Sequence, residues 1–176
     1  MKKKLVGILG AAVIFGGILA GCGTEVEDAS GDSSNKTEQT ESKSTESAKD
    51  KVYKVGDTVK VDGLKITLTK AEFTAPNEYT EATNGKVLTV EVATENDGDA
   101  KSFIDNTDFN LYDKDGNQME SYYGYDEIAI SGDVNKGKKL NGKLFFDVPE
   151  QDSYEIIYTP TFSMDDTEIT FEVTPQ

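Results

Sequence analysis

Gly85-Lys86-Val87-Leu88-Thr89-Val90-Glu91-Val92 carries the clearest secondary-structure signal in this chain of 176 residues. Leu88, Val90 and Val92 alternate with polar or small neighbours, and a period of two is typical of a β-strand with one buried face. The same alternation recurs in three further stretches, which are Leu64–Leu68, Leu140–Val148 and Ile169–Val173.

Shorter apolar runs and frequent turn residues complete this pattern. The shorter runs are Val59–Val61, Phe109–Tyr112 and Tyr154–Tyr158. Gly-containing pairs and prolines are typical of turns, and they lie at Asp62-Gly63, Asn84-Gly85, Asp97-Gly98, Asp115-Gly116, Asn141-Gly142, Pro149 and Pro160. About seven short strands without an apolar stripe at helical spacing predict an all-β fold, a two-sheet antiparallel β-sandwich. Phe146 lies on the inward parity of its strand and Phe145 on the outward one, so we expect Phe145 to contribute clearly less to the core.

The N-terminus has the features of a bacterial signal peptide. Three lysines, Lys2 to Lys4, precede the apolar stretch Leu5–Ala20, which is shorter than the ~20 residues of a membrane span. The run Leu19-Ala20-Gly21-Cys22 resembles the lipobox of lipoproteins, in which the peptide is cut before a cysteine that then carries a diacylglyceryl group. We therefore expect residues 1–21 to be removed and Cys22 to be lipidated; an uncleaved anchor and a plain secreted protein are the alternatives.

Two acyl chains hold a protein stably on a membrane, so lipidated Cys22 predicts attachment to the extracellular face of the cell membrane. Residues 22–51 follow as a segment of Ser, Thr, Glu, Asp and Lys with few apolar side chains. Such a composition predicts a disordered tether, which would stand the domain off the bilayer. Residues 52–176 form one domain of ordinary size.

Composition restricts the chemistry. The formal net charge is −15, and the chain has no Arg and no His. An acidic, Arg-free chain argues against nucleic-acid binding, disfavours contact with anionic membranes and favours a cationic partner or metal ion. The absence of His excludes Ser-His-Asp and Cys-His catalysis, and the single Cys excludes an internal disulfide. Paired carboxylates remain as the one route to a hydrolase, and we expect the protein not to be an enzyme.

Four stretches together resemble a known family. They are Val55–Val59, Gly85–Asn96, Phe109–Gly116 and Asn135–Pro149. They are similar to the immunoglobulin-like domain of unknown function (DUF4352 type) found on Gram-positive bacterial lipoproteins, which is related to a secreted immunoprotective protein of mycobacteria. One departure is Lys136, where the family usually has Pro. The resemblance implies an immunoglobulin-like sandwich and implies no catalytic residues.

Three groups of residues are candidate binding sites. The acidic stretch Asp113–Glu120 fails the register of an EF-hand loop and predicts a hairpin turn. The turns Asn96–Asp99 and Asp105–Asp108 would make a weak Ca²⁺ site if adjacent strands brought them together; the alternative is two solvated turns. The candidate ligands there are Asp97, Asp99, Asp105 and Asp108.

The third group is the aromatic cluster Tyr122, Tyr123 and Tyr125 beside Gly124. Tyrosines in a loop are suited to recognition because the ring is flat and apolar and its tip is polar. By strand alternation, however, Tyr123 and Tyr125 would pack inward instead.

We therefore expect a lipid-anchored, non-catalytic β-sandwich that acts as a cell-surface binding or accessory module for a protein, a peptide or a wall polymer. A Ca²⁺-responsive module is the main alternative, and a carboxylate-based hydrolase is a weaker one.

Overall fold

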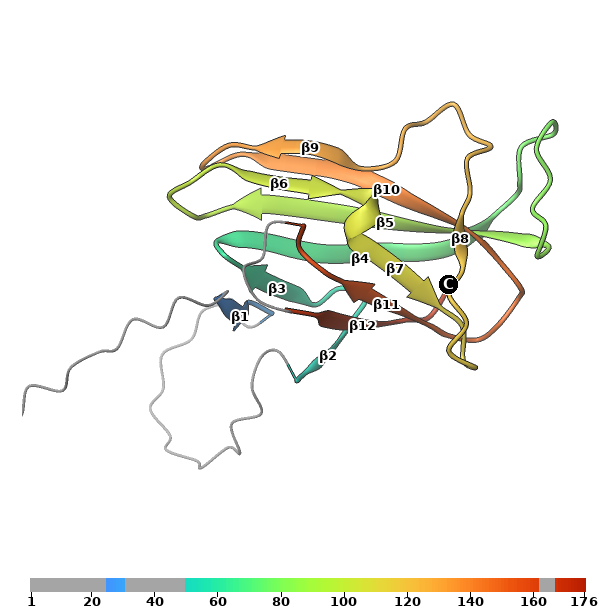
Figure 1. Cartoon of the computed structure of the whole chain (residues 1–176), viewed down its shortest axis with the longest axis horizontal. Helices are drawn as coiled ribbons and strands as arrows, with labels where there is room; N and C mark the ends of the chain where they lie inside the picture. The colour runs from blue at the N-terminus through green and yellow to red at the C-terminus, as the bar shows by residue number, and fades with distance from the viewer. Residues whose placement is uncertain (1–24, 31–49, 162–166) are drawn as a thin grey trace, which may run out of the picture.

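The computed structural model describes residues 25–30, 50–161 and 167–176 (Figure 1). Cys22, the predicted signal peptide and residues 31–49 of the predicted tether lie outside these ranges. The described residues form strands, one 3₁₀ turn and no α-helix, and none of their segments is a helix able to cross a membrane. The elements are β1 (Val26–Asp28), β2 (Val52–Lys54), β3 (Thr58–Val61), β4 (Leu64–Thr74), β5 (Lys86–Asn96), β6 (Ser102–Asp105), η1 (Asn106–Asp108), β7 (Phe109–Tyr112), β8 (Glu120–Ser121), β9 (Ser131–Val134), β10 (Lys139–Val148), β11 (Tyr154–Tyr158) and β12 (Ile169–Val173).

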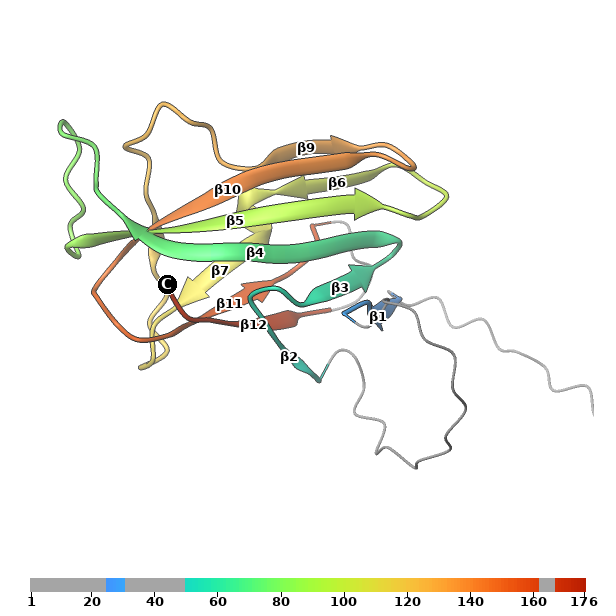
Figure 2. The same cartoon turned by 180° about the vertical axis from the view of Figure 1, so that it is seen from behind.

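Two sheets lie on either side of one apolar core (Figures 1 and 2). The larger sheet has the strand order β1-β3-β4-β5-β10-β8, and the second has the order β2-β12-β11-β7. The predicted all-β sandwich of antiparallel sheets is confirmed. Two features were not predicted, namely the parallel pairing of β2 with β12 and a separate two-stranded sheet of β6 and β9.

The alternating residues form the core as the sequence predicts. Leu88, Val90 and Val92 of β5 are buried, and Ile156 and Phe171 face them from the second sheet. Strand pairs β4–β5 and β5–β10 run antiparallel over ten registered residues each. These three strands are the rigid centre of the domain because each shares a long ladder of backbone hydrogen bonds with its neighbour.

The predicted turns are present with one exception. Asp62 and Gly63 take positive φ angles of 48° and 84° between β3 and β4, as a tight hairpin turn requires. The turn predicted at Asn141-Gly142 is wrong, because both residues lie inside β10. Glycine is needed there because a Cβ on residue 142 would lie 2.7 Å from the Cβ of Ile130.

The prediction of a disordered tether is wrong for residues 25–30. Val26–Asp28 forms β1, which pairs antiparallel with β3 at the edge of the larger sheet. Val26 is partly buried against the core. A three-residue strand is too short to show a period of two, so the polar composition of its surroundings concealed it.

The prediction that Phe145 lies on an uncovered face is also wrong. Phe146 is 3% exposed in the main core, and Phe145 is 7% exposed in a second cluster with Val87 and Tyr122. The second cluster lies on the other side of the sheet. Two loops cover this cluster. They are residues 75–85, between β4 and β5, and residues 122–130, between β8 and β9.

Because both faces of β10 are covered here, Phe145→Ala and Phe146→Ala should each lower the free energy of unfolding by about 3–5 kcal/mol. Urea denaturation followed by circular dichroism measures both losses. Tyr123→Ala is the matched control, because Tyr123 is 82% exposed, and it should change stability by less than about 0.5 kcal/mol. A loss below about 1 kcal/mol for Phe145→Ala would contradict the second cluster.

Candidate functional site

The outward face of β10 holds the two loops in place. Three side chains alternate along this face, Lys143, Phe145 and Asp147. Lys143 pairs with Glu127 of the β8–β9 loop at 2.9 Å, and the nearby carboxylate raises the pKa of the lysine. Each of the three residues thus contacts a loop, and the strand serves as their common floor.

Asp147 holds the β4–β5 loop through its carboxylate. The backbone N–H groups of Thr83 and Asn84 donate to its two oxygens at 2.6 and 2.8 Å. The Asn84 side-chain amide also donates to the backbone carbonyl of Asp147 at 3.3 Å. Asp147 is buried, so its charge is stabilised by backbone donors rather than by water.

The tyrosine cluster is divided between packing and exposure. Tyr122 is buried, and its hydroxyl accepts from the Asn77 N–H at 2.7 Å and donates to the Thr80 carbonyl at 2.6 Å. Tyr125 packs edge-on against Phe145 with ring centroids 5.0 Å apart. Tyr123 points to solvent.

The alternation argument placed Tyr123 and Tyr125 inward, which is wrong for Tyr123 and correct for Tyr125. Residues 122–130 are a loop rather than a strand, so a period of two does not apply to them. Gly124 permits the arrangement, because a Cβ there would lie 2.1 Å from the Tyr122 hydroxyl. Tyr122 and Tyr125 therefore join the two loops, and Tyr123 alone of the three is available to a partner.

Tyr123 and Ile128 flank a cleft of about 270 Å³, here called the tyrosine cleft, whose floor includes Phe145. They are 82% and 87% exposed. Tyr123 also borders a second hollow toward β7, lined by Asn110, Met119 and others. Sequence reasoning found Tyr123 but missed Ile128, because a single apolar residue in a polar loop carries no pattern.

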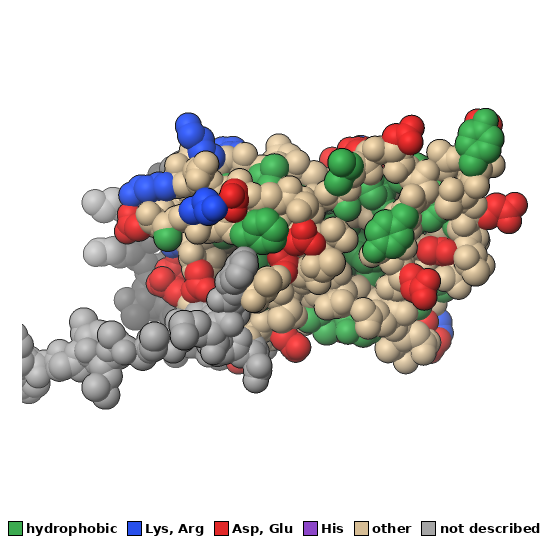
Figure 3. All heavy atoms as spheres, turned by 45° about the horizontal axis from the view of Figure 1, so that its top comes forward, with side chains coloured by type: hydrophobic (Ala, Val, Ile, Leu, Met, Phe, Trp, Pro, Cys, Tyr) green, Lys and Arg blue, Asp and Glu red, His purple; other side chains and the backbone are tan. Residues whose placement is uncertain are grey.

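Carboxylates surround this end of the molecule. Figure 3 shows hydrophobic and acidic side chains together at the end that carries the two loops, and most of the visible lysines at the opposite end. Glu127 is paired with Lys143 and Glu150 with Lys86, but no lysine of the described residues forms an ion pair with four other exposed carboxylates. These are Glu78, Glu81, Glu120 and Asp126.

The two acidic turns, which would have made a weak Ca²⁺ site only if adjacent strands brought them together, do not converge. Asp97 and Asp99 precede β6, whereas Asp105 is its last residue and Asp108 follows it, so the length of that strand separates the two pairs. Asp97 pairs with Lys65 and Asp99 with Lys136. Across residues 25–30, 50–161 and 167–176, no group of three or more carboxylates is placed to hold a metal ion.

The second pair of carboxylates has a structural role at η1. The Asp105 side chain accepts from the Thr107 N–H, and the Asp108 side chain accepts from the Asp105 N–H at 2.9 Å. This is a capping box, which satisfies free N–H groups at the start of a turn. Burial raises the pKa of Asp108, while a hydrogen bond from Thr161 opposes the rise.

The stretch Asp113–Glu120 forms the predicted hairpin turn. The Asp113 carboxylate accepts from the backbone N–H groups of Asp115 and Asn117 at 2.9 and 2.8 Å. Gly116 has a φ of 80°. These bonds use the oxygens that a cation would need.

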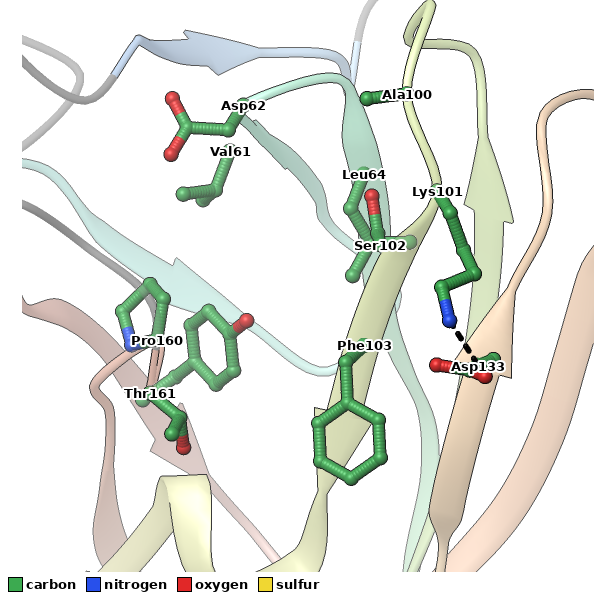
Figure 4. Close-up of a pocket in the computed structure, with 11 residues that line it drawn as sticks. Val61, Asp62, Leu64, Ala100, Lys101, Ser102, Phe103, Asp133, Pro160 and Thr161 are labelled. Atoms are coloured by element: carbon green, nitrogen blue, oxygen red, sulfur yellow. Dashed lines mark hydrogen bonds and ion pairs between the residues drawn. The ribbon is translucent and has the colours of Figure 1, made fainter.

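A second cleft, of about 460 Å³, lies at the end of the sandwich that is opposite to the two loops (Figure 4). Phe103 and Pro160 lie on either side of it, and Tyr158 is also among the residues that line it. Its charged residues already have partners, because Lys101 and Asp133 pair with each other at 2.8 Å and Asp62 accepts from the Glu25 N–H. We place the candidate site at the tyrosine cleft, which has the exposed apolar residues Tyr123 and Ile128.

The family model for the domain of unknown function DUF4352 matches residues 53–169, which run from β2 to the first residue of β12. The chain belongs to this family. The matched range includes β3, β5 and β10, together with the β4–β5 and β8–β9 loops.

Two relatives in Bacillus subtilis are both described as uncharacterized lipoproteins. YcdA is 31% identical over 102 residues, which are 56% of this chain and 29% of YcdA. YjhA is 27% identical over 128 residues, which are 63% of this chain and 60% of YjhA. The chain thus spans less than two thirds of either relative.

Solved structures of both relatives share the fold. The YcdA structure has a TM-score of 0.57 at 29% identity and covers 64% of this chain and 37% of its own. The YjhA structure has a TM-score of 0.58 at 23% identity, with 71% of this chain and 100% of its own covered.

Replacement of Asp147 by Ala should loosen the β4–β5 loop, because the Thr83 and Asn84 N–H groups lose their acceptors. We expect a loss of about 1–3 kcal/mol in stability and faster amide hydrogen exchange at both residues. Glu155→Ala is the control, since Glu155 is exposed on β11. Unchanged exchange at residues 83 and 84 would show that Asp147 does not hold the loop.

Proposed function

We propose that the protein is a lipid-anchored, non-catalytic binding module on the extracellular face of the membrane, and that the tyrosine cleft takes a cationic protein segment with exposed apolar side chains. The exposure of Tyr123 and Ile128 beside a cleft and among unpaired carboxylates is the observation that carries this proposal.

Apolar contact would supply most of the affinity. Complete burial of an exposed Ile side chain contributes about 1.5–3 kcal/mol. A tyrosine adds a flat ring with a polar tip, and such residues are frequent among the few that dominate binding energy. The rigid floor of β10 favours binding, because two hydrogen-bonded loops lose little conformational freedom when a partner binds.

Charge would select the partner. Glu78 and Glu81 of the β4–β5 loop, Glu120 of β8 and Asp126 of the β8–β9 loop are exposed, and the whole chain carries a net charge of −15. A lysine- or arginine-rich segment would be attracted, and a polyanionic wall polymer would be repelled. Protein or peptide is therefore preferred over an anionic polymer as the partner.

The lipid anchor is supported by the lipobox-like run that ends at Cys22 and by the description of both relatives as lipoproteins. The proposal that the protein is not an enzyme is supported by the structural roles of four carboxylates. Asp105 and Asp108 cap η1, Asp113 holds a hairpin turn and Asp147 holds a loop.

The paired substitution Tyr123→Ser and Ile128→Ser should weaken binding of a labelled peptide of Lys-Leu-Gly repeats by about 30-fold or more. Fluorescence anisotropy measures the dissociation constant, and higher salt should weaken binding to the wild type. The melting temperature should stay within a few degrees, because both side chains point to solvent.

Val52→Ser is the control, because Val52 is another exposed apolar residue, on β2. A matched peptide with Glu in place of Lys should not bind. Equal affinity of the doubly substituted protein and the wild type would place the binding surface elsewhere, and a preference for the Glu peptide would contradict the charge argument.

Cys22→Ala should abolish lipid attachment and leave the precursor uncleaved. Detergent phase partitioning and the mass of the mature protein report both effects. Processing and partitioning of the variant like the wild type would contradict the lipobox interpretation.

A further inference from the structure

The lipidated residue is very close in sequence to β1. Only Gly23 and Thr24 separate Cys22 from Glu25. Because an extended chain spans at most about 3.6 Å per residue, Val26 lies within about 14 Å of the Cys22 Cα. Whatever holds β1 therefore also limits how far the domain extends from its anchor.

Backbone hydrogen bonds hold β1 on β3 beyond the three residues of the strand. The Glu25 N–H donates to the Asp62 carboxylate at 2.8 Å, and the Asp62 N–H donates back to the Glu25 carbonyl at 2.8 Å. At the other end the Ala29 N–H donates to the Thr58 carbonyl at 2.9 Å. The segment is thus bonded to the sheet edge along its whole length.

Side chains strengthen this attachment on both faces. Glu27 pairs with Lys60 at 2.5 Å, and Asp28 pairs with Lys51 at 2.5 Å. Val26 packs against the core. Lys51 immediately precedes β2, so this ion pair also joins β1 to the first residues of the second sheet.

Strand β4 sets the distance between β1 and the tyrosine cleft. The strand begins beside the Asp62–Gly63 turn that holds Glu25, and it ends at Thr74, whose hydroxyl bonds to the Tyr125 hydroxyl at 2.8 Å. Its eleven residues span about 35 Å at about 3.3 Å per residue. Figures 1 and 2 both show β1 and the two loops at opposite ends of the sandwich.

The two ends also differ in charge. The β9–β10 turn, at the β1 end, exposes Lys136 and Lys138, and Lys136 pairs with Asp99. The β1 end also exposes carboxylates, but most of them pair with lysines, whereas four exposed carboxylates at the end with the two loops have no lysine partner among the described residues. An anionic bilayer repels the second end more strongly than the first.

We infer that β1 couples the lipid anchor to the edge of the larger sheet, so that the domain lies against the bilayer with its β1 end inward and its tyrosine cleft outward. The inference rests on the lipid anchoring in the proposed function. Residues 31–49 then connect β1 to β2 and do not separate the domain from the membrane.

Energy transfer to the bilayer tests this orientation. The acylated full chain is bound to vesicles of phosphatidylglycerol and phosphatidylcholine that contain a headgroup-labelled acceptor. A donor dye is attached at Lys138→Cys in the β9–β10 turn, at the β1 end of the sandwich, or at Glu81→Cys in the β4–β5 loop; both positions are exposed. We expect strong transfer from position 138, weak transfer from position 81, and a difference in distance of about 30 Å.

Release of β1 should remove this difference. Ala29→Pro deletes the bond to Thr58, and Val26→Asp deletes the apolar contact. With both changes the first fixed strand is β2, about 30 residues from Cys22, and a flexible chain of that length has an r.m.s. span of about 30 Å. Transfer from the two positions should then become similar. Thr40→Pro is the matched control and should keep the wild-type difference.

Equal transfer from positions 81 and 138 in the wild type would overturn the inference, as would an unchanged difference after β1 is released. In either case vesicle attachment itself would still support the proposed anchoring. Failure of the acylated protein to bind vesicles would overturn both the anchoring and the inference.

Discussion

The two-sided use of β10 is the constraint on which the rest of the domain depends. Its inward residues, such as Phe146, complete the core between the sheets, and its outward residues hold two loops. Asp147 accepts hydrogen bonds from two backbone N–H groups of one loop, and Phe145 packs against Tyr125 of the other loop. An ordinary sandwich strand leaves its outward face to solvent. Here that face is the floor of the tyrosine cleft, so core stability and site geometry share one strand.

The same arrangement supports the proposal that this acidic chain without His or Arg binds a partner. In that proposal the site uses exposed apolar area on a rigid support, and Tyr123 and Ile128 supply that area. The acidic surroundings select for positive charge. The bonds of β1 to β3 place the cleft at the far end of β4 from the anchor. In the proposed function, the orientation of the domain depends on β1, β3 and β4, and recognition depends on β10 of the same sheet.

The fold could be predicted from the sequence to a large extent, because period-two alternation in β4, β5, β10 and β12 reports burial directly. The prediction of secondary structure failed where the alternation of apolar residues carries no information. β1 is three residues long, Gly142 is a glycine inside a strand, and residues 122–130 form a loop. Part of the candidate site was visible as a tyrosine cluster. Which tyrosine is exposed depends on contacts between loops about forty residues apart in the chain, such as Tyr122 with Thr80, and no local pattern encodes them.

Site-specific photocrosslinking in living cells tests the central claim, that the tyrosine cleft is where a cationic partner binds. A photoreactive phenylalanine analogue replaces Tyr123, and a second protein carries it at the exposed position 155 on β11. The account predicts a covalent adduct with a discrete protein from position 123 only, and mass spectrometry should locate the crosslink in a lysine- or arginine-rich segment of that protein. No adduct from position 123, an equal adduct from position 155, or a crosslink within an acidic segment would contradict the account.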